Sequence, residues 1–248
     1  MEKYKVLGFC TVHYSGDYMR EALISVEPFV DKMVIAYSEK PSQGHSNNLP
    51  CPDAMTEIHQ MCQEILGDKL IWEYAQSYSS EAHHRDIRYK HAAGFDIVLT
   101  CDSDEVMLGV PEAIEYLMQS GAQYVGIDGY VNFFRSFGWA CYDGFRPIRI
   151  ENLHLKNGIQ DLNCKMTIYH FSCAQRKEVM QYKYKNFGHS SEIKHNYLED
   201  VFYKWSPENN IPDLHPVAIG LWNAVPFDKK KLPIYMLAHP NFHKEIIE

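Results

Sequence analysis

Short apolar runs alternate with amphipathic segments along the first half of the chain. Residues 4–12, 32–37, 69–74 and 95–101 are apolar runs of strand length, rich in β-branched and aromatic side chains. Between them, residues 18–26, 52–66 and 80–93 place apolar side chains at helical spacing. This alternation predicts a mostly parallel central sheet with helices on both faces, and therefore an α/β fold.

The second half of the sequence is less regular. We expect a helix at 111–120, a strand at 123–128, antiparallel strands and loops at 130–151, and helices at 175–187 and 192–204. The tail, residues 206–248, has prolines at positions 207, 212, 216, 226, 233 and 240. Because proline interrupts both helices and ladders, we expect this tail to wrap around the domain as an extension.

Composition excludes some classes of protein. Of the 248 residues, 46% are hydrophobic and 23% charged, and 24 Lys and Arg against 32 Asp and Glu give a net charge of −8, so no global field attracts nucleic acid. The sequence has neither a long apolar stretch nor a signal-peptide core, so we expect a soluble, cytoplasmic protein. Its seven cysteines include no Cys-x-x-Cys pair, which favours reduced, buried thiols over a zinc site.

Three carboxylates follow the fourth apolar run within four positions: Asp102, Asp104 and Glu105. Residues two apart on an extended backbone point to the same side, so Asp102 and Asp104 can face one point at the carboxyl end of a strand. Open α/β sheets bind ligands there, and paired carboxylates suit Mg²⁺ or Mn²⁺ together with substrate phosphates. An ordinary acidic turn would use the same residue types, so these residues alone leave both interpretations open.

The order of motifs resembles family 2 glycosyltransferases with the GT-A fold, over about residues 5–175. The matching segments are Leu23-Ile24-Ser25-Val26, Val30-Asp31, His84-Arg85-Asp86, Ala92-Ala93-Gly94 and Asp102-Ser103-Asp104-Glu105. The resemblance implies a Rossmann-like GT-A domain over residues 1–205, with a nucleotide-binding half at 1–105 and an acceptor-binding half at 106–205. It also implies transfer of a sugar from a nucleoside-diphosphate sugar to an acceptor hydroxyl, with Mn²⁺ or Mg²⁺ and with inversion.

The resemblance further implies roles for single residues. Asp102, Asp104 and His170 would bind the metal. Asp161, in Gly158-Ile159-Gln160-Asp161, would be the catalytic base. The sugar nucleotide would be bound by Thr11, Val12, His13, Arg85, Asp102 and Ser103. The segment 146–149 is similar to the family's Pro-Arg-x-Phe-Arg segment.

The chain departs from the family after its first two strands. His13-Tyr14 stands where the family has Asn-Glu, and Tyr37-Ser38-Glu39 stands where it has Asp-Thr-Gly-Ser. Glu39 is a candidate ribose ligand, although a solvated loop acid fits the sequence equally well. The nucleotide base and the donor sugar therefore stay open.

Several alternatives remain for the function. The expected acceptor is a saccharide of a surface glycan, and the alternative acceptor is a hydroxymethylated DNA base. A noncatalytic sugar-nucleotide-binding protein would keep the same fold. A nucleotidyltransferase is disfavoured, because residues 13–17 hold one glycine where that class has a glycine-rich phosphate loop. The oligomeric state stays open.

Other chemistry-bearing residues have structural explanations in the sequence. We expect His83, His84 and His91 on an exposed helix face, and the basic stretch Lys183-Tyr184-Lys185 on another. For His215 a role in the site is the alternative, but we expect it in a turn. The aromatic residues Phe133, Phe134, Phe137 and Trp139 fit either the core or an acceptor platform.

Overall fold

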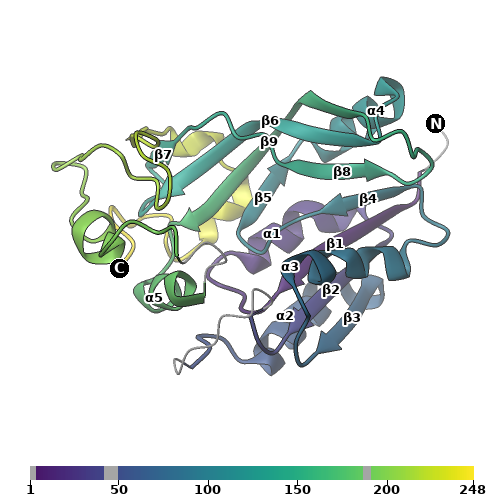
Figure 1. Cartoon of the computed structure of the whole chain (residues 1–248), viewed down its shortest axis with the longest axis horizontal. Helices are drawn as coiled ribbons and strands as arrows, with labels where there is room; N and C mark the ends of the chain where they lie inside the picture. Colours follow the sequence, from purple (N-terminus) through teal and green to yellow (C-terminus); the bar gives the residue numbers. More distant parts are fainter. Residues whose placement is uncertain (1–3, 42–49, 187–190) are drawn as a thin grey trace.

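The first half of the chain forms a parallel sheet, as predicted. The structure is a computed structural model that describes residues 4–41, 50–186 and 191–248. Four parallel strands lie in the order β3-β2-β1-β4 (Figure 1). Their bounds are Val6–Val12 for β1, Lys32–Ser38 for β2, Leu70–Ala75 for β3 and Ile97–Thr100 for β4. Strands β1 and β2 are buried along nearly their whole length, which is why they read as continuous apolar runs.

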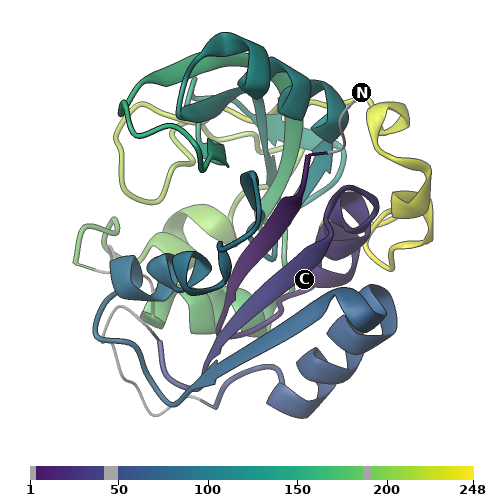
Figure 2. The same cartoon turned by 90° about the vertical axis from the view of Figure 1, so that its right-hand side faces the viewer.

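Helices cover both faces of this sheet, which confirms the predicted α/β class. Helices α1 (Met19–Val26), α2 (Met55–Leu66) and α4 (Val110–Ser120) share one apolar cluster with the sheet. The opposite face packs against Ile87 of the 3₁₀ turn Ile87–His91, and α3 (Glu81–Asp86), which precedes that turn, contacts β2 through His84 and the carbonyl oxygen of Ala36. Figure 2 shows α3 and α1 on opposite sides of β1. The helix predicted at 80–93 is therefore shorter than expected, because its second half tightens into that 3₁₀ turn.

The second half of the sheet is mixed. Strand β4 pairs antiparallel with β8 (Ile148–Asn152), and β8 pairs antiparallel with β6 (Tyr124–Phe134). Strand β6 also pairs antiparallel with β7 (Trp139–Cys141), which in turn pairs with β10 (Val225–Pro226). A 14-residue strand, β9 (Gln160–Cys173), runs parallel to β6 and antiparallel to β5 (Glu105–Leu108). Neither β5 nor the length of β9 was predicted.

The register of β5 and β9 positions the candidate site. Glu105 lies opposite His170 in the β5·β9 pair, and Asn132 lies opposite His170 in the β6·β9 pair. The acids that follow β4 are thereby carried to the end of β9, far along the chain. Helix α5 (Lys177–Asn186) follows β9 and closes this end of the sheet.

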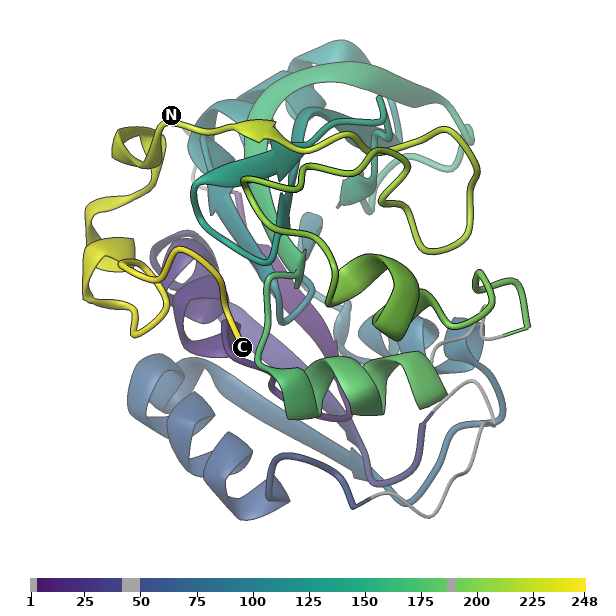
Figure 3. The same ribbon diagram turned by 90° about the vertical axis from the view of Figure 1, so that its left-hand side faces the viewer.

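The carboxyl-terminal residues pack along the second half of the sheet. Leu232, Met236, Phe242 and Ile247 are buried in one cluster with Phe171 and other aromatic residues. Figure 3 shows this segment, in yellow, running beside α1 to the chain end. The helix predicted at 192–204 is reduced to a π-helical turn at Leu198–Phe202, whose Phe202 packs in a neighbouring cluster.

The burial of the aromatic residues and of the cysteines answers two expectations from the sequence. Phe133, Phe134 and Phe137 are fully buried, so they belong to the core and offer no platform to an acceptor. All seven cysteines are free thiols, and only Cys51 is not buried.

In the part of the chain that the structure describes, no helix combines the length and the apolar character needed to cross a membrane.

Candidate functional site

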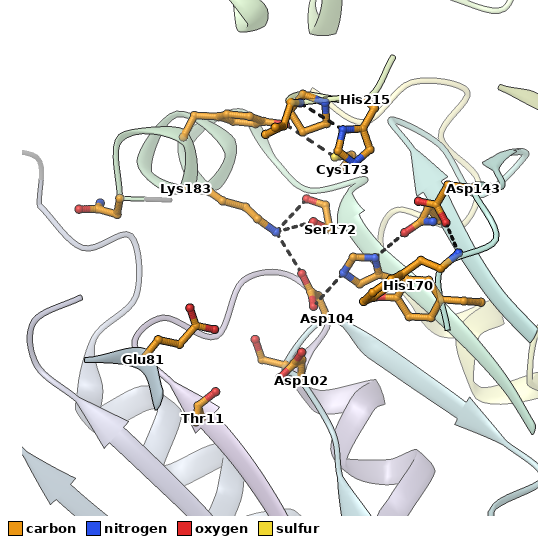
Figure 4. A pocket seen from close by; sticks show the side chains of 18 of the residues that line it. Thr11, Glu81, Asp102, Asp104, Asp143, His170, Ser172, Cys173, Lys183 and His215 are labelled. Carbon is orange, nitrogen blue, oxygen red and sulfur yellow. Dashed lines mark hydrogen bonds and ion pairs between the residues drawn. The ribbon is translucent and has the colours of Figure 1, made fainter. Parts of the chain in front are cut away.

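A cavity of about 880 Å³ opens at the carboxyl ends of β1 and β4. Its walls are the residues after β1, the acids after β4, the ends of β6 and β9, helix α5 and a loop at 215–222. Figure 4 shows Asp102, Asp104, His170 and Lys183 around one space. Of the residues that the sequence assigned to the site, the lining includes Thr11, Val12, His13, Arg85, Asp102, Ser103, Asp104 and His170.

Asp102 is bound between two arginines. Its Oδ2 accepts from Nη2 of Arg149 at 2.9 Å, and its Oδ1 lies 3.4 Å from Nη1 of Arg85. Burial opposes ionisation of Asp102, but Arg149 and Arg85 outweigh it and lower the pKa of the carboxyl. Asp102 is therefore an anion at neutral pH whose two oxygens both face protein cations.

Arg149 also neutralises the buried carboxylate of Glu105. Nε and Nη2 of Arg149 lie 2.7 and 2.5 Å from the two oxygens of Glu105, a side chain with no exposed surface. The hydroxyl of Tyr130 donates to Glu105 at 3.0 Å. This bidentate pair fixes the orientation of the guanidinium plane. In that orientation the guanidinium also donates to Asp102.

Asp104 contacts a lysine and a histidine. Nζ of Lys183 lies 3.2 Å from Oδ2 of Asp104, and Nε2 of His170 lies 3.6 Å from Oδ1. Burial alone would raise the pKa of Asp104, but Lys183 outweighs it and lowers the pKa below its ordinary value. The same ion pair outweighs burial at Lys183 and raises the pKa of its ammonium. Both groups are therefore charged.

His170 presents one ring nitrogen to the pocket. In the neutral tautomer whose Nδ1 donates to Oδ1 of Asn132, 2.7 Å away, the lone pair of Nε2 faces Asp104. Burial lowers the pKa of His170, so the ring is neutral above mildly acidic pH. Asn132 is buried, and within the described residues its Nδ2 has no hydrogen-bond partner. An unpaired buried donor in a pocket wall is suited to a ligand oxygen.

These residues fit a divalent metal through two protein ligands. Oδ1 of Asp104 and Nε2 of His170 are both acceptors and face each other, an arrangement that a shared cation stabilises. Asp102 does not join them in the structure, since both its oxygens are directed to arginines. Across residues 4–41, 50–186 and 191–248, no cluster of three or more His, Cys, Asp or Glu side chains is arranged to hold a metal by itself. Substrate phosphates and water would have to complete the coordination.

The predicted nucleotide wall is held by His13. Its Nδ1 donates to the carbonyl of Ser38 at 2.8 Å, and its Nε2 accepts from the hydroxyl of Tyr182 at 2.6 Å. Burial lowers the pKa of His13, in keeping with a neutral ring. His13 therefore connects β1, β2 and α5 at the pocket edge.

Two predicted site residues lie outside the pocket. Asp161 is near the start of β9, nine residues before His170, which is roughly 30 Å along an extended strand. Its Oδ2 accepts from the hydroxyl of Tyr116 at 2.7 Å. Glu39 is exposed, and its carboxylate accepts from the hydroxyl of Tyr74 at 2.6 Å. The structure thus separates the predicted base and the predicted ribose ligand from the metal acids, because Asp161 lies toward the opposite end of β9 from His170 and Glu39 is exposed to solvent.

The sequence interpretation favoured structural roles for several residues that line the pocket. Lys183 was expected on an exposed helix face, but it is 16% exposed and bound to Asp104. His84 was expected to be solvated, but it is buried, lines the pocket and lies 2.7 Å from the carbonyl oxygen of Ala36. His215 occupies a turn as expected, where Nδ1 accepts from the backbone of Val217 and Ala218, and it also lines the pocket.

Asp143 lines the same pocket between β7 and β8. Its Oδ2 accepts from the indole of Trp222 at 2.7 Å, and its Oδ1 accepts from the backbone of Phe145 at 2.8 Å. Figure 4 shows Asp143 on the side of the cavity where His170 lies. No sequence motif marked this residue, because its partner Trp222 is far along the chain.

Comparison with known proteins found distant structural likenesses. No protein-family model matches the sequence, and no match was found among curated proteins. The 1–349 structure of TarS from S. aureus matches 73% of this chain and 64% of its own, with 13% identity and a TM-score of 0.43. Its complex with UDP-GlcNAc matches 50% of this chain and 34% of its own, with 17% identity and a TM-score of 0.37.

A third likeness is to glucosyl-3-phosphoglycerate synthase from Mycobacterium tuberculosis, solved with Mn²⁺, UDP-glucose and glycerol 3-phosphate. It matches 51% of this chain and 44% of its own, with 17% identity and a TM-score of 0.35. The chain spans less than two thirds of the length of each of these structures.

Proposed function

We propose that the protein is a glycosyltransferase that moves a sugar from a nucleoside-diphosphate sugar to an acceptor hydroxyl. One observation carries the proposal: the acids after β4, His170 and three protein cations converge on one cavity at the carboxyl ends of parallel strands. Such an edge is where open α/β sheets bind nucleotides. Sugar transfer releases a diphosphate, and fixed positive charges stabilise the negative charge that develops on it.

The charge balance of the pocket favours a metal that arrives with the donor. Among the described residues the lining holds five carboxylates, Glu81, Asp102, Asp104, Asp143 and Glu192, against three cations, Arg85, Arg149 and Lys183. A divalent cation offsets this excess of negative charge, and the diphosphate that it accompanies is matched by the cations of the pocket. Asp104 and His170 would hold Mn²⁺ or Mg²⁺, which when bound would act as a Lewis acid toward the leaving diphosphate.

The protein side of the chemistry also requires a base. Asp143 replaces Asp161 as our candidate, because its carboxylate lines the cavity and is oriented by Trp222 and by the backbone of Phe145. A base on the far side of the sugar from the leaving group accepts the acceptor's proton and leads to inversion. The acceptor is proposed to be a saccharide, because the exposed ring of Phe145 lines the same wall and can stack on a sugar.

The experiment that tests this proposal is a donor screen. The protein is incubated with Mn²⁺ and a panel of sugar nucleotides, with and without saccharide acceptors, and released nucleoside diphosphate is measured. We expect release from one donor, stimulated by an acceptor and lost in Asp104→Asn. No release from any donor, with or without acceptors, would contradict a transferase.

The second candidate is a noncatalytic sugar-nucleotide-binding protein. The position of Asp161 favours it, because the carboxylate that the family resemblance supplies as base lies outside the cavity. A protein of this kind would bind a sugar nucleotide in the screen and release no diphosphate from it.

A further inference from the structure

Lys183 lies against the carboxylate that is expected to bind the metal. Its Nζ is 3.2 Å from Oδ2 of Asp104, 2.6 Å from Oγ of Ser172 and 3.3 Å from the carbonyl oxygen of Ser172 (Figure 4). All three contacts are to acceptors at one end of β9 and the acidic turn. The ammonium is therefore the nearest positive charge to Asp104.

Helix α5 holds this ammonium in place. The neighbouring residue, Tyr182, donates its hydroxyl to Nε2 of His13 across the pocket edge at 2.6 Å. Val179 and Met180 anchor the same helix in the core. Lysine on a helix usually extends into water, so a position directed at a buried carboxylate points to a role in the site.

Lys183 and a metal would compete for the same carboxylate. Oδ2 of Asp104 faces the ammonium, while Oδ1 faces His170 at 3.6 Å. A divalent cation held by Asp104 and His170 would lie beside the ammonium, and like charges in a buried pocket repel each other. The ammonium therefore repels the metal and weakens its binding until the ammonium pairs with another anion.

We propose that Lys183 is a positioning residue whose ammonium pairs with Asp104 before the donor binds. When metal and donor bind together, the ammonium leaves Asp104 and pairs with the diphosphate. The proposal rests on the proposed function, and it explains why that site binds the metal weakly in the absence of the donor. Its consequence is reciprocal coupling: the nucleotide strengthens metal binding, and the metal strengthens nucleotide binding.

The test measures Mn²⁺ binding to the intact chain by calorimetry, alone and with UDP, GDP, CDP, ADP or dTDP. Lys183→Met removes the competitor, so we expect it to bind Mn²⁺ alone about tenfold more tightly, and the nucleotide with Mn²⁺ about tenfold more weakly, than the wild type. Lys183→Gln repeats the test with a polar side chain in case the Met variant fails to fold. Lys185→Met, on the exposed side of the same helix, is the matched control and should change neither affinity.

The outcomes separate this proposal from the proposed function. If Mn²⁺ binds the wild type and both Lys183 variants with equal affinity, the proposed exchange of Lys183 between Asp104 and the diphosphate is overturned. If a nucleotide binds in the same experiment, the transferase proposal still stands. If a nucleotide binds the wild type equally well with Mn²⁺ and with EDTA, the exchange is overturned too, because no metal displaces the lysine. If no nucleoside diphosphate binds under any condition, both proposals fail.

Discussion

Nε2 of His170 lies 3.6 Å from Oδ1 of Asp104, although the two residues come from distant parts of the chain. The contact follows from the antiparallel pairing of β5 with β9, in which Glu105 lies opposite His170. Asn132 fixes the other side of the ring through Nδ1. The strand register thus joins an acidic turn and a histidine into one candidate metal and diphosphate site.

Arg149 should be required for folding as well as for the site. Arg149→Met leaves the fully buried carboxylate of Glu105 without its cation, and breaking a buried ion pair costs about 3–5 kcal/mol. Urea denaturation should show this loss in the free energy of unfolding. Arg146→Met removes an exposed pair with Asp128 and should change it by less than about 1 kcal/mol. Equal stability of the two variants would contradict the buried pair.

His84 should make stability depend on pH. Burial lowers its pKa from 6.5 to about 4, so the unfolded chain binds a proton that the folded chain rejects between these values. The contribution of His84 is complete above pH 6.5 and is lost as pH falls toward 4, with a slope of about 1.4 kcal/mol per pH unit. The check is the free energy of unfolding measured from pH 4.5 to 7.5.

The matched variants for this measurement are His84→Gln and His83→Gln, because His83 is the exposed neighbour on the same helix. His84→Gln should reduce the slope of the free energy of unfolding against pH by about the contribution of one bound proton, while His83→Gln should retain the slope of the wild type. Burial also lowers the pKa of His13, His170 and His215, so some slope remains in both variants. Identical curves for the two variants would show that His84 is not the buried titrating group.

Asp143 and Asp161 make opposite predictions as the catalytic base. Asp143→Asn should lower turnover by about 10²- to 10⁴-fold and leave donor affinity unchanged, since a general base acts in the transition state. Asp161→Asn should leave turnover unchanged, because its carboxylate is bonded to Tyr116 at the far end of β9. The reverse pattern would restore the base implied by the family resemblance.

Two isoleucines test how firmly the carboxyl-terminal residues are packed. Ile247 is 1% exposed in the cluster that contains Phe171, and Ile234 is 82% exposed. Ile247→Ala should lower the free energy of unfolding by about 2–5 kcal/mol, and Ile234→Ala by less than about 0.5 kcal/mol. Thermal and urea unfolding of both variants give the comparison. A stable Ile247→Ala variant would mean that the segment is dispensable.

The sequence predicted the parts of the fold that local patterns encode. Strands β1, β2 and β4 are covered on both faces and therefore read as apolar runs, and Gly67 and Gly121 end α2 and α4 with positive φ angles. Strand β5 has four residues directly after the acidic turn, and its partner β9 lies far along the chain. No local pattern specifies such a pairing.

The same limit applies to the site. Asp102, Asp104 and His170 were found by residue type and motif order, and the structure brings them to one cavity. Lys183 was placed on a solvated helix face because nothing near it in sequence shows that β9 ends opposite α5. Asp161 lies outside the cavity because its motif is at the start of a 14-residue strand whose other end reaches the site.

The most direct test of a metal and sugar-nucleotide site is a thermal-shift screen of nucleoside diphosphates and sugar nucleotides, with and without MnCl₂, on the wild type and on Asp104→Ala. A ligand that binds only the folded chain raises the melting temperature by linkage. We predict a Mn²⁺-dependent rise with one nucleotide in the wild type and none in Asp104→Ala. If no nucleotide shifts the wild type with or without Mn²⁺, the transferase proposal is contradicted and the acids after β4 form only an acidic turn.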